Sequence, residues 1–122
     1  MRLSVRFFVA AALYLIAANE CYAGEQLIEP PVVRLIATGG TISNHPNGRL
    51  TADELVALLP SLSRFVSVET EQFVNIPSSA ISLDHWLELS TRLNTILDER
   101  PDLNGIVVTT GTDTLEETAY FL

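Results

Sequence analysis

Three short apolar stretches, separated by helical patterns, leave this chain few folds to adopt. The first, Val32–Thr38, is almost continuously apolar and rich in β-branched residues, as in strands that are buried on both faces. A second strand is expected within Val66–Ile76 and a third over Ile106–Thr109. Helices are expected after each strand, and the order β-α-β-α-β-α predicts an α/β fold with a mostly parallel sheet flanked by helices.

Capping patterns delimit the first and last of these helices. Thr51 and Glu54 have the spacing of a capping box and precede a short helix that is expected to end at Leu59. Thr114 and Glu117 repeat this spacing, which predicts a second capping box at the start of the last helix.

The middle helix is expected over Leu83–Glu99, with Ser82 as its N-cap. Its apolar residues fill one half of a helical wheel and its polar residues the other, as in a helix that packs on a sheet. Glu88 and Arg92 lie on the polar half in the order that favours an i,i+4 ion pair.

Residues 1–23 have the layout of a secretory signal peptide. Arg2 and Arg6 precede the apolar run Phe7–Ala18, and cleavage is expected after Ala23. A membrane anchor is the alternative, but twelve apolar residues are fewer than the roughly 20 that a spanning helix needs. A lipid anchor on Cys21 is a third interpretation, which the acidic residue just before the cysteine disfavours. The protein is therefore expected to be exported, to the periplasm or the medium.

Composition limits the classes of partner. The chain has a formal net charge of −8 and no lysine, so it lacks the clustered cations that nucleic acids and anionic membranes require. A single cysteine excludes an intramolecular disulfide framework. Removal of residues 1–23 leaves a polar lead-in over 24–31 and one small domain over 32–122. The expected partner is a small molecule, with no nucleic acid and no membrane after cleavage.

Hydroxyl side chains gather where the three expected strands end. Ligands of open parallel sheets bind beyond the carboxyl ends of the strands, and the turns there are Thr38–Thr41, Ser78-Ser79 and Thr110–Thr114. Glycines in two of these turns allow backbone N–H groups to approach a ligand, which suits carboxylate binding or an oxyanion hole. Asp113 is a natural partner for a substrate cation.

Each of these features also has a purely structural interpretation. Gly39-Gly40 alone predicts only a tight turn, and Thr112–Thr114 resembles an ordinary helix cap. Neither a dinucleotide-binding nor a nucleoside-triphosphate glycine motif is present in the sequence. His45 and His85 are too few and too far apart to suggest zinc, so no metal and no cofactor are predicted.

Two longer segments carry a family resemblance. Ile36–Ile42 (IATGGTI) and Gly105–Leu122 (GIVVTTGTDTLEETAYFL) closely resemble the two signature segments of bacterial-type L-asparaginases. The similarity covers essentially all of Val32–Leu122, including Ser78 and Trp86 between the signatures.

The resemblance implies the N-terminal domain of a two-domain amidohydrolase that splits asparagine, and often glutamine, into the acid and ammonia. By position, Thr41 corresponds to the nucleophile and Thr112 to the second active-site threonine. Asp113 corresponds to the carboxylate that holds the substrate's α-amino group, and Ser78 and Ser79 to positions at its α-carboxylate. The resemblance also implies a homotetramer.

The sequence departs from the family pattern in three respects. The lid segment Ser43–Thr51 contains no tyrosine, although the family usually supplies one there, and His45 lies in it instead. The family's active-site lysine and the glutamate from a neighbouring subunit's C-terminal domain have no counterpart in the 122 residues. Because Leu122 falls within a helical pattern, we expect the domain to be truncated and residues 1–122 alone to be inactive and poorly soluble.

Two other functions are compatible with parts of this pattern. If the chain truly ends at Leu122, it is a non-catalytic fragment or a weak amino-acid binder. A relative that amidates tRNA-linked glutamate shares the motifs, but that reaction is intracellular and requires tRNA. The signal-peptide pattern and the acidic charge count against it.

Overall fold

The computed structural model describes residues 29–122 and contains a three-stranded parallel sheet. Its strands are β1 (Val32–Gly39), β4 (Ser67–Ile76) and β5 (Gly105–Thr109), in the order β4-β1-β5. The predicted α/β class is therefore confirmed. The predicted signal peptide and most of the lead-in lie outside the described residues.

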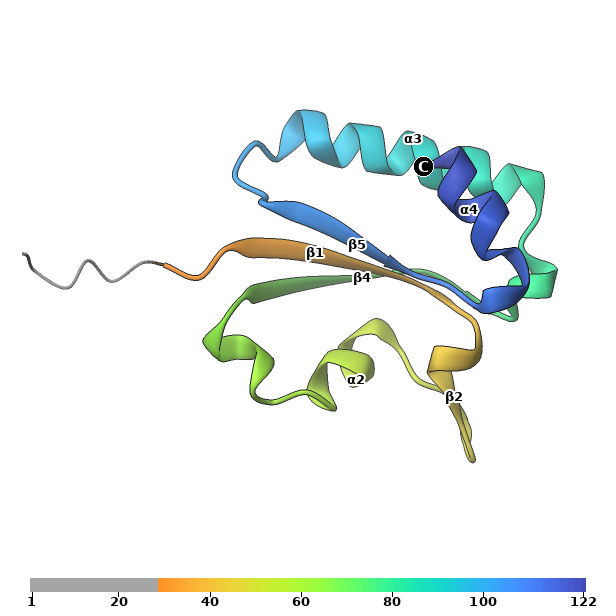
Figure 1. The fold of residues 1–122 in the computed structure, drawn as a ribbon, viewed down its shortest axis with the longest axis horizontal. Coiled ribbons are helices and arrows are strands. Elements are labelled where there is room, and N and C mark those ends of the chain that lie inside the picture. Colours follow the sequence, from red (N-terminus) through yellow and green to blue (C-terminus); the bar gives the residue numbers. More distant parts are fainter. Residues whose placement is uncertain (1–28) are drawn as a thin grey trace, which may run out of the picture.

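Helices cover both faces of the sheet (Figure 1). Helix α2 (Ala52–Ala57) lies on one face, and α3 (Leu83–Glu99) and α4 (Leu115–Phe121) lie on the other. The chain moves from β1 to β4 in one direction and from β4 past β1 to β5 in the opposite direction. Right-handed crossovers in opposite directions place their helices on opposite faces. Within residues 29–122, no helix is long and apolar enough to cross a membrane.

The strand order creates a switch point between β1 and β5. The connection that leaves β1 runs toward β4, whereas β5 pairs with the other side of β1. Ligands of open α/β sheets bind outside the carboxyl ends of the strands, at such a switch point. The turns after β1 and β5 are the ones whose residues resemble the asparaginase signatures.

Two of the three predicted caps are confirmed. Thr51 and Glu54 form the capping box of α2, and Ser82 caps α3, with its backbone N–H donating to His85 Nδ1 at 3.0 Å. The capping box predicted at Thr114 is wrong, because the Thr114 hydroxyl donates to the carbonyl oxygen of Ser78 at 3.3 Å instead.

The core lies between the sheet and α3. Ile36 of β1 and Leu89 and Ile96 of α3 are buried there and are packed by partly buried apolar side chains from β4, β5 and the preceding loop. The opposite face is less covered, and a groove of about 540 Å³ runs between the sheet and α2. Leu58 and Leu59, which line the groove, are 65% and 58% exposed.

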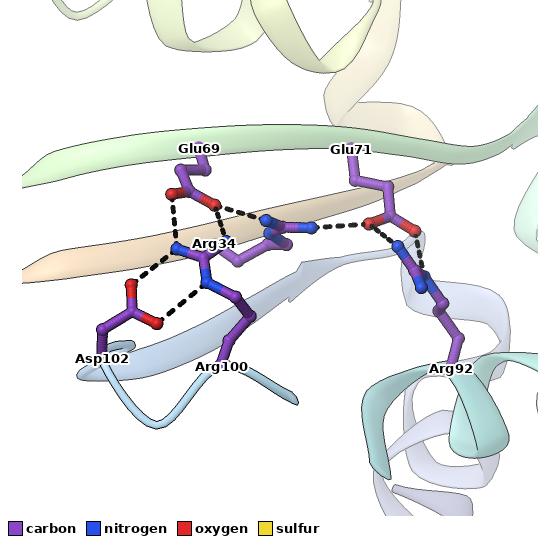
Figure 2. A network of polar contacts seen from close by, with 6 residues as sticks. All are labelled: Arg34, Glu69, Glu71, Arg92, Arg100 and Asp102. Carbon is purple, nitrogen blue, oxygen red and sulfur yellow. Dashed lines mark hydrogen bonds and ion pairs between the residues drawn. The ribbon is translucent and has the colours of Figure 1, made fainter. Parts of the chain in front are cut away.

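An ion network crosses the α3 face of the sheet (Figure 2). Arg34 of β1 binds Glu69 and Glu71, which are neighbours on β4. Arg100 binds both Glu69 and Asp102 (Figure 2). The shortest N–O distances are 2.8 Å to Glu69 and 2.6 Å to Asp102.

The remaining arginine of the network corrects a prediction. Arg92 binds both carboxylate oxygens of Glu71, at 2.8 and 3.0 Å, so the i,i+4 pair with Glu88 predicted from the sequence is wrong. The two hydrogen bonds to Glu71 on β4 are favoured over an ion pair with Glu88, because Arg92 then neutralises a carboxylate that is only 21% exposed.

The arginines hold the carboxylates of this network in their charged form. Hydrogen bonds from Arg100 and Arg34 lower the pKa of Glu69 from 4.5 to about 2. Hydrogen bonding by Arg92 lowers the pKa of Glu71, and hydrogen bonding by Arg100 lowers the pKa of Asp102. A carboxyl group whose folded-state pKa is lowered stabilises the fold above its unfolded-state pKa and loses that contribution as pH falls.

We therefore expect the free energy of unfolding to fall between about pH 4.5 and pH 2, the range between the usual and the lowered pKa of Glu69. Urea unfolding at pH 7, 4.5 and 2.5 measures this. The free energy of unfolding should decrease less in Glu69→Gln than in wild type over this pH range. Glu116 lies at an exposed position of α4 outside the network, so Glu116→Gln should match wild type. An identical pH dependence in wild type and Glu69→Gln would contradict the network's role.

Candidate active site

Three loops meet at the carboxyl edge of the sheet. The Gly40 N–H donates to the carbonyl oxygen of Ile76 at 2.9 Å and joins the end of β1 to the end of β4. The Thr38 hydroxyl donates to the carbonyl oxygen of Thr109 at 2.9 Å and joins β1 to β5. These bonds make the three predicted turns a single surface.

The turn after β1 depends on its two glycines. Gly39 and Gly40 have φ angles of 96° and 77°, in the region that residues with a Cβ atom rarely adopt. A Cβ atom on Gly40 would also lie 2.6 Å from the Cα of Gly111, in the turn after β5. The glycines therefore allow the two loops to touch, and they direct the chain into the 3₁₀ turn Thr41–Ser43.

The structure brings two of the predicted site residues into contact. The Ser78 hydroxyl donates to the Asp113 carboxylate at 3.2 Å. Ser78 is 4% exposed, whereas Asp113 is exposed at the surface of the turn Thr112–Thr114. Asp113 is thus held by a buried hydroxyl and keeps a face open to solvent.

The other three predicted site residues, Thr41, Thr112 and Ser79, lie exposed at the same edge. Thr41 and Thr112 each begin a 3₁₀ turn, after β1 and after β5. Within residues 29–122, neither of these two hydroxyls forms a hydrogen bond with another described residue, and both face solvent. The structure therefore places the two threonines on neighbouring loops without joining them.

A small hairpin beside the site was missed in the sequence. Strands β2 (Asn44–His45) and β3 (Gly48–Arg49) pair antiparallel, and Arg49 Nη1 donates to the Gly40 carbonyl oxygen at 2.9 Å. The two loop residues are Pro46 and Asn47, and neither has a positive φ angle, so the hairpin lacks the usual two-residue turn whose sequence signal would have revealed it. The sequence gives no indication of the contact between Arg49 and Gly40, because this contact depends on how the hairpin folds back toward the turn after β1.

The structure also narrows the choice of oxyanion donors. The Gly40 N–H is engaged by Ile76 and is not available to a ligand. The first residues of a helical turn have N–H groups without partners in that turn, so the N–H groups at Thr41 and Thr112 remain candidates. In the part of the chain that the structure describes, no group of three His, Cys, Asp or Glu side chains could hold a metal ion.

This arrangement combines the groups needed to bind and attack a small polar molecule. The Asp113 carboxylate can bind a cation such as an ammonium group. Two exposed threonine hydroxyls lie on the adjacent loops, and a hydroxyl becomes a nucleophile when a base or a polarising group activates it. The site therefore fits attack on a carbonyl group of an amine-bearing substrate.

Comparison with known proteins identifies relatives of this chain. Residues 32–122 match the family model described as asparaginase, N-terminal. The chain is 37% identical to L-asparaginase 2 of Escherichia coli over 97% of its length and 35% of the relative's. It is 35% identical to a glutaminase-asparaginase of Pseudomonas fluorescens over 100% of its length and 37% of the relative's.

A solved structure supports the same relationship. The crystal structure of a probable cytoplasmic L-asparaginase from Campylobacter jejuni superposes with a TM-score of 0.66 at 33% identity, over 74% of this chain and 27% of that one. The chain thus spans about a third of the length of the curated relatives it matches.

Proposed function

The chain belongs to the asparaginase family, and on that basis we propose that the full-length protein hydrolyses L-asparagine, and also L-glutamine, to the acid and ammonia. The full-length protein is the complete product of the gene that encodes these residues. The observation that carries the proposal is the meeting of three loops at the β1–β5 switch point, with an exposed carboxylate beside two exposed threonines.

Each candidate residue has a role that its surroundings support. Thr41 is the nucleophile that the asparaginase signature implies, and its exposed position leaves it accessible to a substrate. Asp113 binds the substrate's α-ammonium group. Ser78 orients the Asp113 carboxylate, to which it donates a hydrogen bond.

The remaining roles are those that the asparaginase resemblance implies for residues on the same edge. Thr112 is the second active-site threonine and lies next to Asp113 on the same turn. Ser79 follows buried Ser78, is exposed, and contacts the α-carboxylate end of the substrate. Backbone N–H groups at the two 3₁₀ turns stabilise the oxyanion of the tetrahedral intermediate.

The rest of the machinery is proposed to lie outside residues 1–122. The curated relatives are about three times as long as the segment that aligns with them. We place there a lysine that pairs with Thr112 and a second domain whose glutamate reaches a neighbouring subunit's site. The active form is proposed to be the homotetramer that the family resemblance implies. Residues 1–122 alone are then inactive. The pattern in residues 1–23 supports export by cleavage after Ala23.

The proposal is tested with purified full-length protein and L-asparagine, L-glutamine and D-asparagine as substrates. We expect ammonia and L-aspartate in equal amounts from L-asparagine, and much slower release from the D-isomer. Binding of L-asparagine without ammonia release would instead indicate an amino-acid binder. Activity that requires glutamyl-tRNA would indicate the amidating relative.

The Asp113→Asn variant should raise KM for L-asparagine by about 10- to 100-fold, the worth of one hydrogen bond to a charged group. The amide keeps an oxygen that can accept from Ser78 but loses the charge that attracts the substrate's ammonium group. Steady-state kinetics measure this, with Asp98→Asn, at an exposed position of α3, as a matched control. An unchanged KM in Asp113→Asn would exclude the proposed role.

A further inference from the structure

A line of four hydrogen bonds leads from α3 to the Asp113 carboxylate. The Trp86 indole Nε1 donates to Thr118 Oγ1 on α4 at 3.1 Å, and Thr118 Oγ1 donates to the Thr114 carbonyl oxygen at 2.8 Å. The Thr114 hydroxyl donates to the Ser78 carbonyl oxygen at 3.3 Å. The Ser78 hydroxyl then donates to Asp113 at 3.2 Å.

The central member of this line is a buried hydroxyl. Thr118 is 5% exposed, and the space that it shares with Trp86 and Thr110 has no room for a water molecule. The indole ring is also fixed, because it stacks on Phe121 at a centroid distance of 5.4 Å and an interplanar angle of 12°. A replacement of the same shape as threonine therefore leaves no space in which a water molecule could take over the hydrogen bonds of this hydroxyl.

The turn that carries Asp113, Thr112–Thr114, is not held by a side-chain cap on α4. The Thr114 side chain makes no capping hydrogen bond to α4, and Thr112–Thr114 is a single 3₁₀ turn between β5 and that helix. The position of this turn is therefore set by its contacts with Ser78 and with Thr118. Because Asp113 precedes Thr114, a shift of the Thr114 backbone moves the carboxylate.

We propose that Trp86 and Thr118 are positioning residues for substrate binding, which hold the Asp113–Thr114 segment in place from behind the site. This inference rests on the proposed amidohydrolase function. The two residues touch no substrate and act through Thr114. Their loss should therefore weaken substrate binding at Asp113 more than the chemical step at Thr41.

The test compares three variants of the full-length protein with wild type. Thr118→Val keeps the shape of the side chain and removes the hydroxyl, Thr118→Ser keeps the hydroxyl, and Trp86→Phe keeps an aromatic ring to stack on Phe121 but removes the indole N–H. Thr91→Val is the matched control, since the Thr91 hydroxyl donates to the carbonyl four residues earlier on α3, away from the site.

We expect Thr118→Val to raise KM for L-asparagine about tenfold, the worth of one buried hydrogen bond, with kcat changed less than about threefold. Trp86→Phe should raise KM by about threefold to tenfold, and Thr118→Ser and Thr91→Val should resemble wild type. A wild-type KM in Thr118→Val, or equal impairment in Thr118→Ser and Thr118→Val, would overturn the proposal.

Hydrogen exchange separates this proposal from the proposed function. Backbone amides of residues 111–118 should exchange at least about fivefold faster in Thr118→Val than in wild type, because loosening a segment lowers its opening free energy. Their exchange rates in Thr91→Val should equal those of wild type. A wild-type protein without amidohydrolase activity refutes the function alone. Unchanged exchange in Thr118→Val refutes the positioning role, whether or not the protein is active.

Discussion

The Thr41→Ala variant of the full-length protein should lose at least about 1000-fold in kcat for L-asparagine, because removal of a nucleophile that acts in concert with its neighbours abolishes most of the rate enhancement. Thr41 is exposed, and its hydroxyl bonds no other residue in the described range 29–122. The fold should therefore tolerate the change within about 0.5 kcal/mol, as for other surface substitutions. Initial rates of ammonia release and the unfolding midpoint, measured on the same preparation, test both expectations.

Two further variants make this test specific. Thr41→Ser keeps a hydroxyl at the same position and should retain part of the activity. Thr112→Ala removes the hydroxyl of the other exposed threonine. Full activity in Thr41→Ala combined with an inactive Thr112→Ala would transfer the nucleophile from the turn after β1 to the turn after β5.

The Gly40→Ala variant should lose both stability and activity. Its φ angle of 77° strains any residue with a Cβ atom, and that atom would lie 2.6 Å from the Cα of Gly111. Strain and overpacking together should cost roughly 2–5 kcal/mol in the free energy of unfolding. If the loops separate to relieve the overlap, Thr41 moves with Gly40, and a displacement of about 1 Å costs on the order of 100-fold in rate.

Gly48→Ala is the matched control for this prediction. Gly48 has a φ angle of 135°, but a Cβ atom there would meet nothing within 4 Å. It therefore reports the backbone strain alone, roughly 1–3 kcal/mol. Chemical unfolding and kcat of the two variants separate strain from overlap, and wild-type kcat in Gly40→Ala would show that contact between the two loops is not needed.

The order and type of the main elements follow from local patterns. The strand expected over Val32–Thr38 extends by one residue, and the helix expected over Leu83–Glu99 has those limits in the structure. Apolar periodicity and capping residues act within one or two turns of chain, so the sequence shows them directly. The location of the hydroxyl-rich turns can also be predicted from the sequence, because the carboxyl ends of parallel strands lie at one edge of the sheet.

Two of the failed predictions concern the partner of a side chain. Arg92 has an acidic neighbour four residues earlier but binds Glu71, 21 residues away, because β4 presents that carboxylate to Arg92 across the gap between sheet and helix (Figure 2). Thr114 has a capping partner within reach but donates to Ser78, 36 residues away. Sequence spacing indicates which partners are close along the chain. It does not indicate which residues from distant segments lie next to the same side chain in the folded protein.

The sequence by itself determined the α/β class, the edge of the sheet that carries the site, and the residues available there. Only the tertiary structure decided that β1 is central, that the β1–β5 switch point faces this edge, and that Trp86 and Thr118 connect α3 to Asp113. The reason is physical. Secondary structure and caps depend on interactions between close neighbours in the chain, whereas the geometry of the site depends on contacts that exist only once the crossovers have placed distant loops together.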